Sequence, residues 1–449
     1  MSILVSLNRE QKEAVGLLQI GTFLEYFDFM LYIHMAVLLN ELFFPETDPH
    51  TASLLAAFAF CSTWVFRPIG ALIFGYIGDH IGRKTTVIIT TMMMSLSCVI
   101  MANLPTYAQI GLAASWIVTI CRIVQGLSSM GEKIGAEIYV SEITKPPSAY
   151  PAVAFVAVAS AMGAMGALGV ATLTTSYGFN WRTAFWIGAG IAVLGSVART
   201  RLRETPEFVD MKIKLKLAME KRNLQNRVDS KRLAKTGDIE TKVPLSTVMS
   251  YFFIQCGWPL TFYLVYVCFN PILKDVYGYS SADIIHHNFI LTVIQVIEAI
   301  GLAYMSYYVY PLKILKVKNY VTLLVMVAIP FWISMSSSSF DIFLLQILIL
   351  TFCTSEIPAQ YIFIKTIPVY RRFTASSFIY ASARALTYVV TSFGIVCMIS
   401  CFGYVGILII TLPLWVGLFW GVRHFEKLEG LRLPKQTRIK EEAVLSKAA

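Results

Sequence analysis

Long apolar runs, each about the length that crosses a bilayer, recur from near residue 15 to near residue 424. Crossing the hydrocarbon core takes about 20 apolar residues in a helix. The runs are continuous and do not alternate over about ten residues, so they predict helices and not barrel strands. The expected fold is therefore an all-α membrane protein. Twelve spans are predicted, the ninth interrupted by Pro330: 15–40, 52–78, 86–103, 107–141, 150–175, 181–202, 244–270, 281–309, 320–336, 339–366, 372–399 and 402–424.

Composition excludes a water-soluble alternative. Of the 449 residues, 56% are hydrophobic and only 14% are charged, and the mean hydropathy is +0.64. A typical soluble domain contains about 25% charged residues. A soluble fold could not cover this much apolar surface, so lipid is the expected surroundings of the chain.

Basic residues fall on alternate loops, and this predicts the orientation in the membrane. One set of loops carries Arg83, Lys84, Lys145 and the basic stretch 199–243, whereas the opposite loop 41–51 is acidic. Because cytoplasmic loops carry an excess of Lys and Arg, both termini are expected in the cytoplasm, with the chain in a bacterial inner membrane. The net charge of +10 then needs no nucleic-acid partner. No cleavable signal peptide is expected, because the first apolar run is too long.

A polar break divides the apolar runs into six and six. Two pseudo-symmetric bundles joined by a cytoplasmic loop are typical of secondary transporters. The break is expected to be a solvated, partly helical linker, and no coiled coil is expected in the tail. The predicted units are an N-terminal bundle (1–202), the linker (203–243), a C-terminal bundle (244–424) and a cytoplasmic tail (425–449).

A short, glycine-rich and charged loop, Gly75-Tyr-Ile-Gly-Asp-His-Ile-Gly-Arg-Lys84, joins the second and third spans. It resembles the signature loop of the major facilitator superfamily of transporters. Four further stretches resemble the metabolite:proton symporter branch, which includes proline/betaine transporters. The resemblance implies the twelve-helix major facilitator fold and proton-coupled transport. These stretches are Gly21–Phe29, Arg67–Gly70, Arg122–Gly126 followed by Gly131-Glu132, and Leu202–Phe208.

The chain departs from this branch at several positions. Met130, Lys133 and Ile134 stand where the fourth-helix motif usually shows Gly, an aromatic residue and Gly. Lys365 stands at a position where the resemblance predicts an acidic residue. In the second half, the loop equivalent to the signature loop, 307–318, keeps its basic residues but lacks the Gly and Asp. The loop 307–318 is expected to be held in place by lipid or by the tail, unlike the signature loop.

Ionisable groups at membrane depth are candidates for function because they are costly unless paired or hydrated. Glu25 and Asp28 share one face of the first helix, and with Glu132 they are the proton-coupling candidates. The alternative is that they are structural acids bonded to Arg67 or Arg122. Those two arginines are the candidates for the anionic end of a substrate.

Further candidates flank these groups. Gln125, next to Arg122 on the fourth helix, is assigned to substrate binding, and Glu137 is expected to pair with Lys133 four residues earlier. Glu356, just before Pro358, is a buried acid where the helix is expected to break. The remaining buried candidates in the second half are Glu298 and Arg384, and aromatic residues such as Tyr263 and Tyr266 can contact a cationic ammonium group or simply pack.

The signature loop is expected to form a gate: Gly75, Asp79, Gly82, Arg83 and Lys84. Gly75, with Gly78, should let the second and third helices approach closely. Asp79 can accept hydrogen bonds from the N-terminus of a neighbouring helix. Arg83 and Lys84 are expected to pair with acids at the cytoplasmic end, such as Glu142 or Glu204.

The prediction is a secondary transporter that symports protons with a small polar solute by alternating access, with a proline- or betaine-like zwitterion favoured. The alternatives are a proton-coupled dicarboxylate or tricarboxylate transporter and a transporter-like solute sensor. An enzyme is not expected, because no nucleophile, phosphate-binding loop or metal cluster stands out, and no cofactor is implied. The expected partners are the solute, protons and the bilayer, and a monomer is plausible.

Overall fold

The computed structural model describes residues 8–34, 39, 42–44, 64–177, 180–200, 202–226, 243–353 and 355–432. Regular structure in these residues is helical throughout, which confirms the all-α prediction. Eight helical stretches among them are long and apolar enough to cross a membrane, the last of which, Val369–Gly430, contains more than one helix. Residues 227–242 of the predicted linker and 433–449 of the predicted tail lie outside the described residues.

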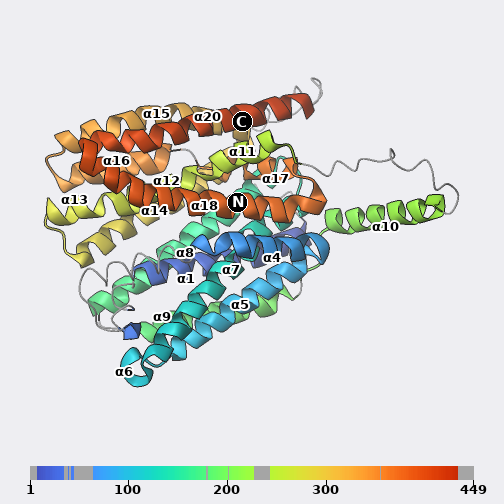
Figure 1. Cartoon of the computed structure of the whole chain (residues 1–449), viewed down its shortest axis with the longest axis horizontal. Helices are drawn as coiled ribbons and strands as arrows, with labels where there is room; N and C mark the ends of the chain where they lie inside the picture. Colours follow the sequence, from blue (N-terminus) through green and yellow to red (C-terminus); the bar gives the residue numbers. More distant parts are fainter. Residues whose placement is uncertain are drawn as a thin grey trace.

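The first half of the chain supplies six long helices that correspond to the first six predicted spans: α1 (Arg9–His34), α4 (Arg67–His80), α5 (Arg83–Asn103), α7 (Leu112–Ile143), α8 (Ala149–Tyr177) and α9 (Trp181–Arg199). A single short turn of helix, α6 (Tyr107–Ile110), precedes α7. The break after α9 is followed by α10 (Pro206–Asn226), so this part of the predicted linker is helical. In Figure 1, α10 projects from one end of the bundle.

Several helices of the second half are interrupted. One span runs through α11 (Leu245–Gln255), α12 (Gly257–Tyr263), the π-helical η2 (Leu264–Cys268) and α13 (Asn270–Asp275). The helix break expected near Glu356 is confirmed, because α16 ends at Phe352 before η3 and α17 begin. The remaining elements are α14 (Ser281–Tyr308), α15 (Pro311–Met335), α16 (Ser339–Phe352), η3 (Ile357–Ala359), α17 (Gln360–Thr366), η4 (Val369–Arg371), α18 (Arg372–Val389), η5 (Val390–Ile395), α19 (Val396–Phe402), η6 (Gly403–Val405) and α20 (Gly406–Arg432).

Two helices extend beyond their predicted spans. The ninth span begins at Pro311 and contains Pro330, so most of the expected loop 307–318 is helix. Pro at the first helical position suits the start of α15, because its missing N–H has no helical partner there. The last helix, α20, continues to Arg432, into the predicted tail. Its extra turns hold the start of α15, since Lys316 lies 3.1 Å from Glu426.

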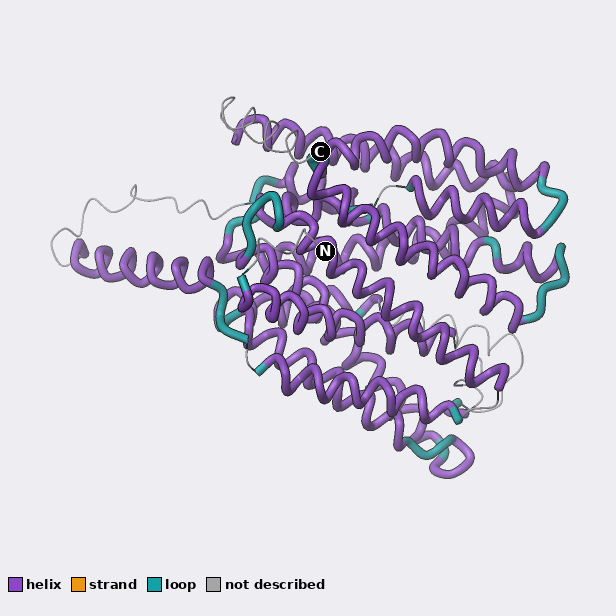
Figure 2. Tube along the Cα trace, turned by 180° about the vertical axis from the view of Figure 1, so that it is seen from behind, coloured by secondary structure: helices purple, strands orange, loops and turns teal. Residues whose placement is uncertain are grey.

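The helices lie side by side, with their connections at the two ends of the bundle (Figure 2). The signature loop, α10 and η4 lie together at one end, which we call the basic end. The two halves of the chain meet mainly where α4 packs against α18 and α8 packs against α14. Gly75 permits the first of these contacts, because a Cβ there would lie 2.6 Å from Thr374 Cα of α18. The predicted partner, the third span, is therefore wrong.

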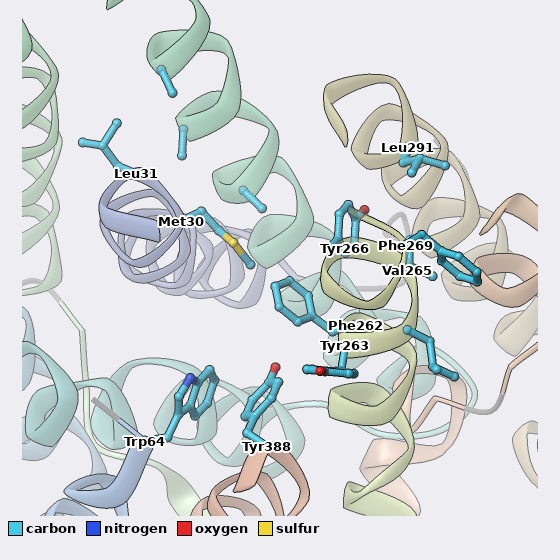
Figure 3. Packing of buried hydrophobic residues seen from close by; sticks show 14 of the residues in the cluster. Met30, Leu31, Trp64, Phe262, Tyr263, Val265, Tyr266, Phe269, Leu291 and Tyr388 are labelled. Atoms are coloured by element: carbon cyan, nitrogen blue, oxygen red, sulfur yellow. The ribbon is translucent and has the colours of Figure 1, made fainter. Parts of the chain in front are cut away.

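A large buried apolar cluster packs between the two halves, and Figure 3 shows part of it from close by. It joins residues of the first half, such as Met30 and Trp64, with Phe262 and Tyr388 of the second half. The Trp64 and Tyr388 rings lie with centroids 4.5 Å apart. Aromatic pairs of this kind contribute about 0.5–1.5 kcal/mol beyond their buried area. The cluster therefore holds the two halves together.

Candidate functional site

Six charged side chains are buried in the middle of the bundle, and we call them the central cluster: Glu25, Arg67, Lys133, Glu137, Glu356 and Arg384. They come from α1, α4 and α7 of the first half and from α18 and the broken helix before η3 in the second. The three acids and the three bases form ion pairs with one another, so each charge has a partner. Such pairing is what permits ionisable groups at membrane depth.

Lys133 lies between two carboxylates of the central cluster. Its Nζ is 4.0 Å from Glu137 Oε1, which confirms the predicted contact along α7. It is also 3.7 Å from Glu356 Oε1, across the boundary between the two halves. Arg384 donates to the same Glu356 oxygen at 3.1 Å. Lys133 therefore links the halves, a role that its position on α7 alone did not indicate.

Amide side chains extend this link toward α11 and α17. Gln360 Nε2 donates to Glu137 Oε2 at 2.6 Å and lies 3.0 Å from the Tyr251 hydroxyl. Gln255 Nε2 donates to Gln360 Oε1 at 3.2 Å, and its own Oε1 accepts from Arg384 at 3.1 Å. These hydrogen bonds connect Glu137 of α7 with α11, α17 and α18 of the second half.

A small cavity opens beside Lys133 and Glu356 between the two halves of the chain. Ionic, amide, hydroxyl, aromatic and aliphatic groups share its surface. Its lining residues are Tyr26, Lys133, Ala157, Ser160, Trp258, Gln295, Ala299, Glu356 and Ile357. Three elements of the second half (α12, α14 and η3) and three helices of the first half (α1, α7 and α8) are represented, so the cavity changes shape whenever the halves move relative to each other.

Glu25 and Arg67 do not line this cavity, although Tyr26, which follows Glu25 on α1, does. Arg67 Nη1 is 3.5 Å from Glu25 Oε1, and neither carboxylate oxygen has a hydrogen-bond partner among the residues that the structure describes. The neighbouring hydroxyls of Tyr26 and Tyr380 are 3.1 Å apart and join α1 to α18. Glu25 can therefore accept a proton without the loss of a hydrogen bond.

Asp28 is separated from Glu25 and lies inside the first half. Its Oδ2 is 3.7 Å from Arg122 Nη1, and Cys98 Sγ lies 3.6 Å from its Oδ1. Arg122 also donates to Gln125 Oε1 at 3.0 Å. The two acids thus have different arginines, as the structural alternative expected, and Arg122 and Gln125 do not line the cavity.

Glu132 belongs to a third group of charges, together with Arg199. Its carboxylate accepts hydrogen bonds from Arg199 and from the hydroxyls of Thr90, at 3.2 Å, and Thr91. Gly21 makes room for this pair, because a Cβ there would lie 2.0 Å from Arg199 Nη2. Sequence reasoning missed Arg199, because the predicted span ended at 202 and placed it at a membrane edge.

Tyr263 and Tyr266 do not line the cavity. Tyr263 lies in the apolar cluster, and the Tyr266 hydroxyl donates to Gln295 Oε1 at 2.9 Å (Figure 3). Glu298, another predicted candidate, lies 2.7 Å from Lys318 Nζ of α15 and is also absent from the lining. Of the two aromatic side chains that do line the cavity, Tyr26 lies in the stretch Gly21–Phe29 that resembles the symporter branch, whereas Trp258 lies in none of those stretches.

A second set of ion pairs closes the basic end, and we call it the basic-end cluster: Asp79, Arg83, Glu142, Glu207, Lys365 and Arg372. Asp79 accepts from the backbone N–H groups of Phe373 at 3.0 Å and Thr374 at 2.9 Å. These N–H groups begin α18 and have no partner within their own helix. The expectation that Asp79 caps a neighbouring helix is confirmed, and that helix belongs to the other half.

Arg83 pairs with Asp79 and Glu142, each at 3.2 Å, which confirms one of its two predicted partners. Glu142 is shared with Arg372 at 3.0 Å, so α7 and α18 are joined. Glu204 instead accepts from the backbone of Arg83 at 3.0 Å.

The other loop residues act through their backbone. The Lys84 N–H, not its side chain, lies 3.4 Å from Glu204 Oε1. Gly82 makes room for this carboxylate, since a Cβ at Gly82 would lie 2.1 Å from Glu204 Oε2.

Glu207 of α10 completes the basic-end cluster by bonding Lys365 and, at 2.7 Å, Arg372. Lys365 thus binds an acid, Glu207, at a position where the resemblance to the symporter branch predicts an acidic residue. Burial alone would raise the pKa of the Glu207 carboxyl, but Lys365 and Arg372 outweigh burial and hold its pKa below the ordinary value. A carboxyl whose pKa is lower in the folded protein than in the unfolded chain stabilises the folded contact at every pH above its unfolded pKa. That stabilisation is lost only as the pH falls through the folded pKa.

The contact of Glu207 with Lys365 and Arg372 is therefore expected to be insensitive to pH between about 6 and 8, because the ordinary pKa of Glu is already about 4.3 and the pKa of Glu207 lies below its ordinary value. Spin labels at exposed Arg371 and at Lys84 should give the same distance distribution across that range. A distribution that broadens between those values would contradict this assignment. Glu207→Gln should broaden the distance distribution between the two spin labels at every pH, and this variant provides the control.

The sequence was then compared with known proteins. Residues 16–306 match the family described as "Sugar (and other) transporter". A proline/betaine transporter of Salmonella typhimurium is 31% identical over 204 residues, which cover 44% of this chain and 41% of that protein. A citrate-proton symporter of Salmonella typhi is 35% identical over 202 residues, which cover 43% of this chain and 46% of that protein. The chain thus matches less than half the length of each relative.

The fold was compared with solved structures. A double-Trp variant of XylE superposes with a TM-score of 0.71 at 16% identity, covering 92% of this chain and 93% of that one. The human organic anion transporter MFSD10 superposes with a TM-score of 0.66 at 14% identity, covering 92% of this chain and all of that one. XylE is described as a proton:xylose symporter of the major facilitator superfamily. At these identities the likeness shows a shared fold.

Proposed function

Because the chain belongs to the sugar (and other) transporter family and has the major facilitator fold, we propose that it symports protons with a small zwitterionic solute by alternating access. The family is one of membrane transporters and not of enzymes. In this proposal the chain lies in a bacterial inner membrane with its basic end in the cytoplasm. The bundles 1–202 and 244–424 rock against each other about the central cluster.

One observation carries the proposal: the cavity lies between the two halves and is closed on both sides by contacts that can separate. Ion pairs of the basic-end cluster close one side. Apolar contacts such as Trp64 on Tyr388 close the other. A carrier has to break these contacts alternately, whereas a fixed channel would have no use for them. The cavity surface carries an ammonium group, Lys133, and a carboxylate, Glu356, as a zwitterion requires.

Glu25 is the group that we propose to carry the proton. It precedes the cavity-lining Tyr26 on α1, and in the part of the chain that the structure describes it forms an ion pair with Arg67. When Glu25 is protonated, Arg67 loses an opposite charge and the net charge of the central cluster rises by one. Glu132 is a weaker candidate, because a proton there would compete with the hydrogen bonds from Arg199 and Thr91.

An organic acid is the second candidate substrate, and one comparison favours it. The citrate-proton symporter of Salmonella typhi is among the relatives, at 35% identity. The proline/betaine transporter of Salmonella typhimurium, at 31% identity, favours the zwitterion instead. The cavity argues for the zwitterion, because Glu356 would repel a second carboxylate of a dianionic or trianionic acid.

The test is uptake by purified full-length protein in proteoliposomes, with a panel of amino acids, betaines and organic acids. Uptake is measured with and without an imposed pH gradient, acidic outside. We expect concentration of a zwitterion that is lost when the gradient is collapsed. Uptake that ignores the gradient would reject proton symport, and counterflow of labelled solute would separate a carrier from a sensor.

A further inference from the structure

We infer that the solute is held at two points and must carry N–H donors: its carboxylate binds Lys133 and its ammonium N–H binds Glu356. The inference rests on the proposed function and narrows it. It favours solutes with a primary or secondary ammonium group, such as amino acids and imino acids. It disfavours fully methylated betaines, although both kinds are zwitterions.

The first observation concerns the two oxygens of Glu356. Oε1 accepts from Arg384 at 3.1 Å and pairs with Lys133 at 3.7 Å. Oε2 is buried and has no hydrogen-bond partner among the described residues. Glu356 as a whole is only 3% exposed, yet it lines the cavity. A buried acceptor without a donor is costly, and a solute N–H placed in the cavity is a donor that can remove this cost.

The second observation concerns Lys133. Its distances to Glu356 and Glu137, 3.7 and 4.0 Å, exceed those of hydrogen bonds, so its ammonium group holds neither acid tightly. Lys133 also lines the cavity. A solute carboxylate can approach this ammonium group while both acids keep other partners: Arg384 for Glu356 and Gln360 for Glu137.

The third observation argues against a quaternary ammonium group. Such groups are bound by cages of aromatic faces. Among the residues that the structure describes, two aromatic side chains line this cavity, Tyr26 and Trp258. Lys133 Nζ already lies 5.7 Å from the Tyr26 ring centroid, so one of the two faces is next to a positive charge. A trimethylammonium group would therefore find Trp258 alone and would leave Glu356 Oε2 without a donor.

A methylation series tests the inference. Glycine, sarcosine, N,N-dimethylglycine and glycine betaine lose their N–H donors one after another and keep the same carboxylate. Their competition against labelled proline is measured on the full-length protein in detergent, and their uptake is measured in proteoliposomes. We expect affinity to fall about 10- to 100-fold when the last N–H is lost, the range that one unpaired buried group causes.

Three variants assign the effect to residues. In Glu356→Gln, Arg384 and Lys133 hold the amide oxygen, so an NH2 group takes the place of Oε2 and the preference for N–H donors should disappear or reverse. Lys133→Gln should weaken the binding of all four compounds by a similar factor and keep the preference for N–H donors. Glu298→Gln, an equivalent change at an acid that does not line the cavity, should keep both affinity and preference.

Betaine that binds as tightly as sarcosine, or a preference that survives in Glu356→Gln, would overturn the inference and leave proton-coupled transport intact. If no compound of the series is bound while citrate is taken up with protons, the zwitterion and the inference both fail. Loss of preference in Glu298→Gln would also overturn the assignment to Glu356.

Discussion

Asp79→Asn is expected to reduce transport about 10- to 100-fold while the protein still inserts and folds. The asparagine NH2 would face one of the two backbone N–H groups at the start of α18, and the ion pair with Arg83 would be lost. Removal of one partner of a buried pair destabilises by about 3–5 kcal/mol, because the other charge stays buried. The closed state of the basic end would lose that stability, and the transporter would accumulate in the open state. Uptake in proteoliposomes measures the effect.

Lys84→Gln provides the matched control for this prediction. Lys84 lies in the same loop and carries the same charge as Arg83, but it contacts Glu204 through its backbone N–H. Its substitution is expected to leave uptake within about twofold, as for other changes at the surface. Arg83→Ala should behave like Asp79→Asn. Normal uptake by Asp79→Asn and Arg83→Ala would contradict the gate, and an equal loss in Lys84→Gln would mean that loop charge alone matters.

Arg199→Met is expected to cause the largest loss of stability of any single change considered. Arg199 is fully buried and bonds Glu132, Thr91 and two backbone carbonyls of α1, those of Leu17 and Leu18. Its removal would leave the Glu132 carboxylate buried without a cation, at about 3–5 kcal/mol. Thermal unfolding of the detergent-solubilised protein, followed by α-helical circular dichroism, measures the loss.

A second variant separates lost charge pairing from lost packing. In the double variant Arg199→Met, Glu132→Gln, the carboxylate is neutral and most of the lost stability should return. Recovery should be incomplete, because Leu17 and Leu18 carbonyls still lack the arginine. A double variant as unstable as Arg199→Met would contradict the pairing. If Glu132→Gln alone abolished proton-coupled uptake without loss of stability, Glu132 and not Glu25 would carry the proton.

The sequence was sufficient for the fold class, but among the predicted substrate-binding residues only Glu356 lines the cavity. Apolar run length reflects bilayer thickness, so the helical spans could be read directly. The need to pair charges in lipid likewise identified Glu25, Asp28, Arg67, Arg122 and Glu356 as residues that would be buried with partners. Hydropathy did not predict helix ends that are rich in polar residues. Lys313, Lys316 and Lys318 were assigned to a loop, yet they begin α15, and Lys318 is buried beside Glu298.

Pairing between halves could not be predicted, because it depends on how the two bundles face each other. Helical spacing offered Glu137 as a partner for Lys133, four residues away. Nothing in the spacing connected Lys133 with Glu356, more than 200 residues along the chain and 3.7 Å away in space. The same reason explains why Gly75 was matched with the adjacent helix and not with α18. Local rules identify which residues need partners, and only the packed structure identifies those partners.

Proton movement that accompanies solute entry is the most direct test of the account. Proteoliposomes that contain the full-length protein and a trapped pH-sensitive dye receive proline outside, with no imposed pH gradient. The account predicts that the interior becomes more acidic as solute enters, and that Glu25→Gln abolishes this acidification. Solute entry without any change of internal pH in the unaltered protein would contradict proton symport.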